Sequence, residues 1–249
     1  WSSLLVSGLV ILFIFIIFWP WINAFFPLTA GDWPYIFAEQ VLEFPWLPEA
    51  KNLWLAPYNQ ILTKIAIQYL KLPWEIYEKI FWFFPFVILS AAASYLAFRS
   101  WISVLIYTTN TYSLMIVGGG QMGVAMAYAL APWTFARPSF LPIVIQTMFD
   151  PRITLLTLVA SLFVTRPNIK KLFLSLLLVF AVHLYWIIPV IRSPIISEGL
   201  LQASAGMLEF LSFATFSQTI SLLHPNWPEN VFGKVYFMQP EFLLVPIIA

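Results

Sequence analysis

The sequence predicts an all-α protein, a bundle of helices that crosses a membrane several times. Hydrophobic residues make up 61% of its 249 residues and charged residues only 9%, whereas water-soluble domains carry about 25% charged residues. Long stretches contain no charge at all, as from Trp1 to Gly31 and from Ser100 to Ala136. So little polar surface cannot cover a water-soluble globule, and lipid must therefore cover much of the protein.

Apolar runs of membrane-spanning length place the individual helices, because about 20 helical residues cross the hydrocarbon core. We interpret the whole sequence, residues 1–249, as a single transmembrane domain and as a fragment of a longer protein. A short hairpin is expected at 138–165, although an interfacial helix followed by one span fits this range too. Spans are predicted at about 4–22, 78–98, 101–117, 121–137 and 172–191, with a further span beginning at about 241.

Basic residues give the orientation. Arg166, Lys170 and Lys171 directly precede the span 172–191, and such clusters mark cytoplasmic ends. Arg99 and Arg137 fall on the same side if 138–165 is a hairpin. The two long loops, 27–77 and 192–240, then face outward. We therefore expect a multi-pass protein of the plasma membrane whose long loops are extracytoplasmic.

The first outer loop differs from the rest of the chain in its acidic and aromatic character. Residues 27–79, which are this loop and the two residues that follow it, hold six of the eleven acidic residues. Within it, apolar side chains recur at helical spacing and polar ones lie on the opposite side, which predicts an amphipathic helix in the membrane interface. Loops this long usually have a function. The apolar side is Tyr58, Ile61, Leu62, Ile65, Tyr69 and Leu72, and the polar side is Gln60, Lys64, Gln68 and Lys71.

Asp32 is the first ionisable side chain in the sequence and stands where the first span ends. A lone carboxylate in this place could serve as a general base. Asp followed by Trp33 and Pro34 is also a typical helix N-cap. The two roles can coexist, although capping lowers the pKa of a carboxylate and weakens it as a base.

Several other side chains are candidates for binding substrate. Arg192, His224 and Lys234 could hold a phosphate at the outer surface. His183 lies within a predicted span, where a polar group faces the bundle interior either as a packing residue or as a catalytic one. Tyr35, Tyr58 and Gln121 complete the predicted substrate-binding set.

Some classes of function are excluded or unsupported. A net charge of +1 is too small for a nucleic-acid-binding protein. Cysteine is absent and the two histidines lack metal-ligand spacing, so no cofactor is predicted, although a divalent metal would be compatible with the sequence.

The glycines from Gly118 to Gly123 formally contain a G-x-G-x-x-G pattern. A dinucleotide site would need a preceding strand, whereas apolar helices are expected on both sides here. We interpret Gly119 and Gly123 as small residues that let helices pack closely. The alternative is a broken helix that exposes Gln121 to a cavity.

Three motifs together resemble the polytopic membrane glycosyltransferases of the GT-C fold, in particular the arabinofuranosyltransferase- and mannosyltransferase-like proteins of bacteria and archaea. The first is Gly31-Asp32-Trp33 in an acidic loop after the first span. The second is Tyr107-Thr-Thr-Asn-Thr-Tyr112, followed by Gly119-Gly120-Gln121 and Ala127-Tyr-Ala-Leu-Ala-Pro132. The third is Tyr185-Trp-Ile-Ile-Pro189.

The resemblance implies a sugar transfer from a polyprenyl-phosphate donor to a glycan acceptor hydroxyl, with Asp32 as the base. A second acid next to Asp32, common in the family's motif, is absent. That departure leaves open a non-catalytic protein of the same fold or a metal-independent variant of the enzyme. A further alternative, from another class, is a transporter or flippase of a lipid or lipid-linked precursor. Transporters often carry ionisable residues at the membrane midplane in repeated halves, and neither feature is evident here.

Overall fold

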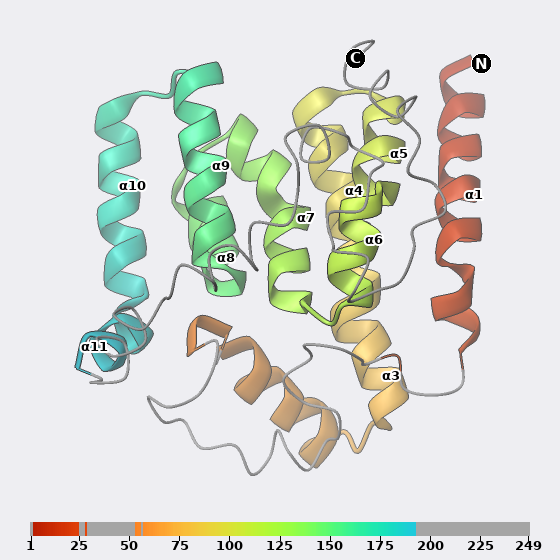
Figure 1. Ribbon diagram of the computed structural model, residues 1–249, viewed down its shortest axis with the longest axis horizontal. Helices are drawn as coiled ribbons and strands as arrows, with labels where there is room; N and C mark the ends of the chain where they lie inside the picture. The colour runs from red at the N-terminus through yellow and green to blue at the C-terminus, as the bar shows by residue number, and fades with distance from the viewer. Residues whose placement is uncertain (1, 25–27, 29–52, 56, 193–249) are drawn as a thin grey trace, which may run out of the picture.

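The computed structural model describes residues 2–24, 28, 53–55 and 57–192, and these form helices joined by short turns, without a strand (Figure 1). The predicted all-α class is thereby confirmed. The N-terminal elements are α1 (Ser2–Asn23), η1 (Leu53–Leu55), η2 (Pro57–Leu62), η3 (Ile65–Tyr69), α3 (Trp74–Glu78) and η4 (Lys79–Phe83). They are followed by α4 (Phe84–Phe98), α5 (Trp101–Thr109), α6 (Thr111–Gly118), α7 (Met122–Ala136), α8 (Phe140–Phe149), α9 (Pro151–Val164), α10 (Ile169–Val182) and α11 (Leu184–Arg192).

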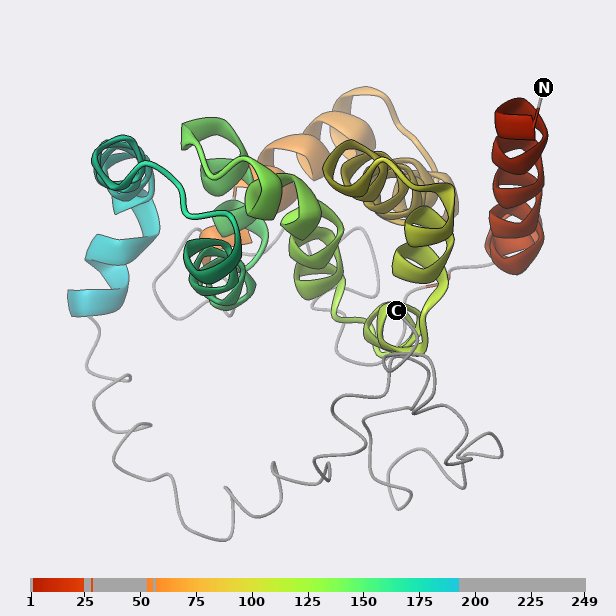
Figure 2. The same ribbon diagram turned by 90° about the horizontal axis from the view of Figure 1, so that it is seen from above.

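The longer helices stand side by side as a bundle (Figures 1 and 2). Helix α4 packs against α5 and α7, α7 packs against α8 and α9, and α1 and α10 lie at the two sides, on α5 and α8. Within the described ranges, two helices are long and apolar enough to cross a membrane, Leu4–Asn23 and the continuous α3–η4–α4 helix, Trp74–Phe98. At one end of the bundle, η2, η3 and α11 lie across the others (Figure 1).

Helix α9 has its polar side inside and its apolar side outside. Its hydroxyl side chains Thr157 and Ser161 are buried, whereas Leu155, Leu156 and Phe163 are 63%, 65% and 78% exposed. A helix of a water-soluble protein has the opposite arrangement. Helix α10 also exposes a row of large apolar side chains: Phe173, Leu174, Leu177, Leu178 and Phe180.

Hydrogen bonds between buried polar groups fasten α8 and α9 to α7. The amide Nε2 of Gln146 donates to the Ala127 carbonyl and to the Thr157 hydroxyl, each at 3.0 Å. The Ser161 hydroxyl donates to the Phe135 carbonyl at 3.0 Å. The range 138–165 is therefore a pair of helices joined at Asp150.

Two ranges that we predicted as single spans are each divided into two helices. In 101–117 the break falls at Asn110, whose extended backbone lets its side chain accept from the Ser113 amide and begin α6. In 172–191 the break falls at His183, where α10 ends and α11 turns across the bundle. The length of an apolar run does not report such polar capping, so each pair of helices was predicted as one.

The helix predicted between Tyr58 and Leu72 is present as η2 and η3, wound partly as π-helix. Ile61, Ile65 and Tyr69 point away from the bundle and are 54%, 44% and 77% exposed. Tyr58 and Leu72 instead pack against the core. The predicted apolar side is thus divided between the bundle and its surroundings.

Basic residues lie at both ends of the bundle, and five of those described lie at the end opposite η2 and η3. Each connection at that end carries basic side chains, and the connections α6–α7, α8–α9 and α10–α11 lie at the end with η2 and η3 (Figure 1). The basic residues at that end are Arg99 between α4 and α5, Arg137 between α7 and α8, and Arg166 with Lys170 and Lys171 around the start of α10. The end with η2 and η3 carries five others: Lys64, Lys71, Lys79, Arg152 and Arg192.

Candidate functional site

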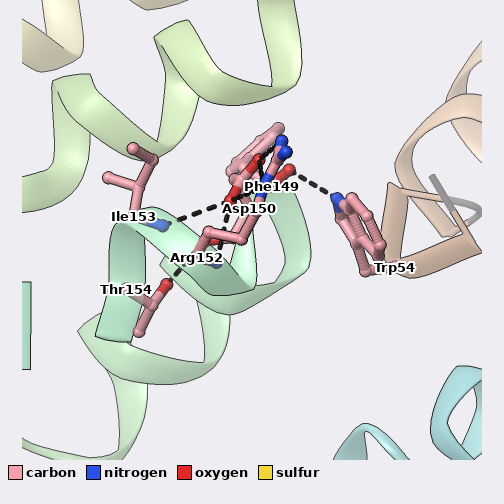
Figure 3. A network of polar contacts seen from close by, with 6 residues as sticks. All are labelled: Trp54, Phe149, Asp150, Arg152, Ile153 and Thr154. Carbon is pink, nitrogen blue, oxygen red and sulfur yellow. Dashed lines mark hydrogen bonds and ion pairs between the residues drawn. The ribbon is translucent and has the colours of Figure 1, made fainter. Parts of the chain in front are cut away.

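The candidate site lies at the end of the bundle that carries η1, η2 and α11, and it centres on the α8–α9 turn (Figure 3). Asp150 is buried there and caps α9, because one carboxylate oxygen accepts from the Arg152 amide at 2.8 Å and the Ile153 amide at 3.2 Å. Pro151 follows as the first helical residue, which suits its fixed backbone angle and missing N–H.

Arg152 gives this turn an outward-facing cation. Its Nη2 lies 2.6 Å from the second oxygen of Asp150, and its Nε donates to the same carboxylate. The Asp150 side chain is 2% exposed and that of Arg152 is 69% exposed. The third guanidinium nitrogen, Nη1, makes no hydrogen bond within the described part of the chain and is available to an anion. The buried acid thus holds the guanidinium in a fixed orientation.

Trp54 connects the turn to two distant segments. Its indole N–H donates to the Phe149 carbonyl at 3.0 Å, next to Asp150 (Figure 3). Its own carbonyl accepts from the Tyr185 hydroxyl at 2.5 Å, and its ring packs edge-on against Trp186 of α11. The segment around η1, the α8–α9 turn and α11 therefore meet at one place.

His183, predicted as a substrate-binding residue, lies under this contact with both ring nitrogens occupied. The Trp186 indole donates to Nδ1 at 2.8 Å, so the ring proton is on Nε2, which donates to the Val144 carbonyl at 3.1 Å. The side chain is buried. In this arrangement His183 joins α10, α11 and α8 and offers no nitrogen to a ligand.

Tyr58, another predicted binding residue, is also engaged within the protein. Its hydroxyl donates to the Phe81 carbonyl, and its ring packs edge-on against Trp82 and Phe149. Burial, and secondarily the nearby Tyr77, raises the pKa of the Tyr58 phenol well above its ordinary value. The phenol therefore remains protonated and acts as a hydrogen-bond donor.

Glu78 and Lys79 fasten the chain that leaves α1. A Glu78 carboxylate oxygen accepts from the Leu28 amide at 2.5 Å, and the Lys79 ammonium donates to the Ala24 carbonyl. Glu78 is fully buried. The predicted base Asp32 and the candidate Tyr35 follow Leu28 in the sequence and lie outside the described residues.

The remaining candidates are only partly placed. Gln121 begins α7 and Arg192 ends α11, both at the end of the bundle that carries the Asp150 turn. His224 and Lys234 lie outside the described residues. The structure thus brings Tyr58 and His183 into the contacts around Trp54 and Phe149, as structural members of that network.

The Asp150–Arg152 pair was not predicted from the sequence, in which these residues marked only the break in a hairpin. A signal was present, because Asp150-Pro151 after an apolar run is the same N-cap pattern that drew attention to Asp32.

Gly123 lies in close contact with the site. A Cβ atom there would stand 2.5 Å from Cδ1 of Leu55 and 3.0 Å from the Phe149 carbonyl oxygen. The close packing predicted for this glycine is therefore present. The helix is also broken just before it, where Gly120 adopts a left-handed backbone with φ 78° between α6 and α7.

No protein-family model matches this chain, and none of the curated proteins or solved structures compared with it is significantly similar. Among the described residues, no group of three or more His, Asp or Glu side chains is placed to hold a metal ion.

Proposed function

We propose that this chain is the membrane domain of a GT-C-type glycosyltransferase, which moves a sugar from a polyprenyl-phosphate donor to an acceptor hydroxyl at the outer membrane face. The observation that carries the proposal is the gathering of functional groups at one end of the bundle. The start of the acidic loop is fastened there by Glu78 and Lys79, and the Asp150–Arg152 pair lies at the same end. Arg152 offers a cation for a phosphate, and the bond from Leu28 to Glu78 holds the start of the loop that carries Asp32 at the same end.

The exposure pattern supports several membrane crossings rather than two. Hydroxyl side chains of α9 face its neighbours and large apolar side chains face outward, as in helices that pack through polar contacts within lipid. Helix α10 exposes apolar side chains along its length in the same way. Helices α7, α8 and α9 are shorter than a full span, and in this proposal they cross as tightly packed, partly broken segments.

The two ends of the bundle support an orientation. Each of the three short connections at one end carries basic residues, namely Arg99, Arg137, and Arg166 with Lys170 and Lys171. In this proposal that end is cytoplasmic by the positive-inside rule, although the other end carries five basic residues too. The end with Asp150 and the interfacial helix η2–η3 then faces outward. Exposed Ile61, Ile65 and Tyr69 suit a helix resting on the outer surface of the bilayer.

The proposed chemistry divides between Asp32 and Arg152. The Asp32 carboxylate takes the proton of the acceptor hydroxyl as its oxygen forms a bond to the anomeric carbon. The bond between that carbon and the phosphate oxygen breaks, and the polyprenyl phosphate leaves with the electron pair. Arg152, held by Asp150, supplies fixed positive charge near the departing phosphate. General-base assistance contributes about 10² to 10⁴ in rate, and electrostatic stabilisation adds to it.

The test is turnover of a polyprenyl-phosphate sugar in proteoliposomes that contain the full-length protein. A panel of undecaprenyl-phosphate sugars is supplied, and released undecaprenyl phosphate is measured by mass spectrometry. Asp32→Asn should reduce release by about 10² to 10⁴, whereas Glu49→Gln in the same loop should leave it unchanged. Full activity of Asp32→Asn would contradict the assignment of the base.

The same assay separates the alternatives. A transporter or flippase would move the intact lipid-linked sugar between leaflets without releasing the phosphate. A non-catalytic protein of this fold would bind the donor and do neither. Either result with the wild-type protein would overturn the proposal of sugar transfer.

A further inference from the structure

An apolar groove runs between α1 and α4, which belong to the two helices long enough to span a membrane. Ile11, Phe15 and Trp21 form one wall, and Phe84, Val87 and Ile88 form the other. Its volume is about 210 Å³, and no polar atom contributes to its surface. An apolar cavity of about 150 Å³ already holds a benzene molecule, so this groove has room for a segment of hydrocarbon chain.

The α1 wall of the groove is about as long as one leaflet of a bilayer, whereas the α4 wall, from Phe84 to Ile88, is about 6 Å long. The α1 wall extends from Ile11 to Ile22, which at 1.5 Å per residue is about 16 Å. Half of a hydrocarbon core of about 30 Å is about 15 Å. The α1 wall therefore reaches from the membrane surface at the Asn23 end of α1 to the middle of the bilayer, the path of a single acyl chain.

A cation stands beyond the surface end of the groove. Lys79 donates to the carbonyl of Ala24, immediately after α1, and Trp21 of the groove packs edge-on against Phe83, four residues after Lys79. An ammonium group has three donors, and only the Ala24 carbonyl accepts from Lys79 within the described residues. A charge at this place complements a phosphate headgroup.

We propose that the α1–α4 groove is a phospholipid site, in which one acyl chain fills the groove and the headgroup phosphate lies at Lys79. The bound lipid would join α1, which packs on the rest of the bundle mainly through α5 and η4, to the α3–η4–α4 helix. This site is separate from the Asp150–Arg152 turn, and the proposal does not depend on sugar transfer.

The test is native mass spectrometry of the full-length protein in mild detergent, first stripped of lipid and then titrated with phosphatidylglycerol. The wild-type protein should bind one lipid more tightly than any further ones. Ile11→Trp and Val87→Trp fill the groove from its two walls and should each weaken that first binding at least tenfold. Leu174→Trp, on the exposed face of α10, is the matched control and should not change it.

A second comparison tests the headgroup. Lys79→Gln should abolish the preference for phosphatidylglycerol over diacylglycerol of the same chain length, without removing binding of the chain. Three results would overturn the proposal: no preferred lipid on the wild-type protein, unchanged binding in both tryptophan variants, or undecaprenyl phosphate binding in preference to phosphatidylglycerol. The wild-type titration decides the matter even if a tryptophan variant fails to fold.

Discussion

Replacing Gly123 by alanine tests how closely α7 must approach η1 and the end of α8. The added methyl group would lie 2.5 Å from Leu55 Cδ1 and 3.0 Å from the Phe149 carbonyl oxygen. Leu55 is buried, and the Phe149 carbonyl is backbone that already accepts a hydrogen bond from Trp54. Neither neighbour can move without disturbing the contacts of the candidate site.

The expected cost follows from two opposing effects. Overpacking of this kind costs about 1–3 kcal/mol, whereas alanine favours a helix over glycine by about 0.8–1 kcal/mol. We therefore expect Gly123→Ala to lower the free energy of unfolding by up to about 2 kcal/mol. For a chain of this size each kcal/mol shifts the Tm by about 2–4 °C, so the Tm should fall by up to about 8 °C.

The assay is thermal unfolding in detergent, followed by circular dichroism. Gly118→Ala is the matched control, because its Cβ would meet no atom within 4 Å; its Tm should stay the same or rise slightly. In a Leu55→Ala background, Gly123→Ala should cost less, since the nearest clash is gone. The reasoning is refuted if Gly123→Ala is as stable as Gly118→Ala.

Three further predictions concern the site. Asp150→Ala removes the cap of α9 and should lower the free energy of unfolding by about 1–2 kcal/mol in a denaturant titration, whereas Arg152→Gln should cost at most about 1 kcal/mol because that side chain is largely exposed. Arg152→Gln should nevertheless reduce release of polyprenyl phosphate at least tenfold, and Arg99→Gln, at the opposite end, should leave it unchanged; equal rates in these two variants would contradict the phosphate role. Since burial raises the pKa of the Tyr58 phenol in the folded state, stability should fall as pH rises above about 10, the ordinary value, and Tyr58→Phe should show a smaller loss of Tm between pH 9 and pH 11.

Much of the architecture could be predicted from the sequence because the distribution of apolar residues reports it directly. The charge-free runs correspond to helices, and the period of apolar residues between Tyr58 and Leu72 corresponds to η2 and η3. Helix breaks could not be predicted in this way. They depend on polar groups at Asn110 and His183, and one polar side chain leaves the surrounding run almost as apolar as before.

The candidate site was harder to predict because its members come from distant segments. Trp54, Phe149 and Tyr185 are connected by hydrogen bonds between side chains and backbone carbonyls, and a carbonyl carries no sequence signature. For His183, the sequence left packing and catalysis open, and only its two hydrogen-bond partners favour packing. The guanidinium of Arg152 is held in place by Asp150, which is buried. The sequence does not show that Asp150 is buried.

The most direct test is to measure which side of the membrane each end of the bundle faces. The proposed function places the acidic loop, η2–η3 and the Asp150–Arg152 pair on the outer face. The chain contains no cysteine, so a single introduced thiol reports one position without background. Gln68→Cys marks the end of the bundle with η3, and Ser139→Cys marks the opposite end, in the α7–α8 connection. Both positions are exposed. With a membrane-impermeant maleimide, Gln68→Cys should react in intact cells and Ser139→Cys only after permeabilisation. The reverse pattern, or labelling of both positions in intact cells, would contradict the account.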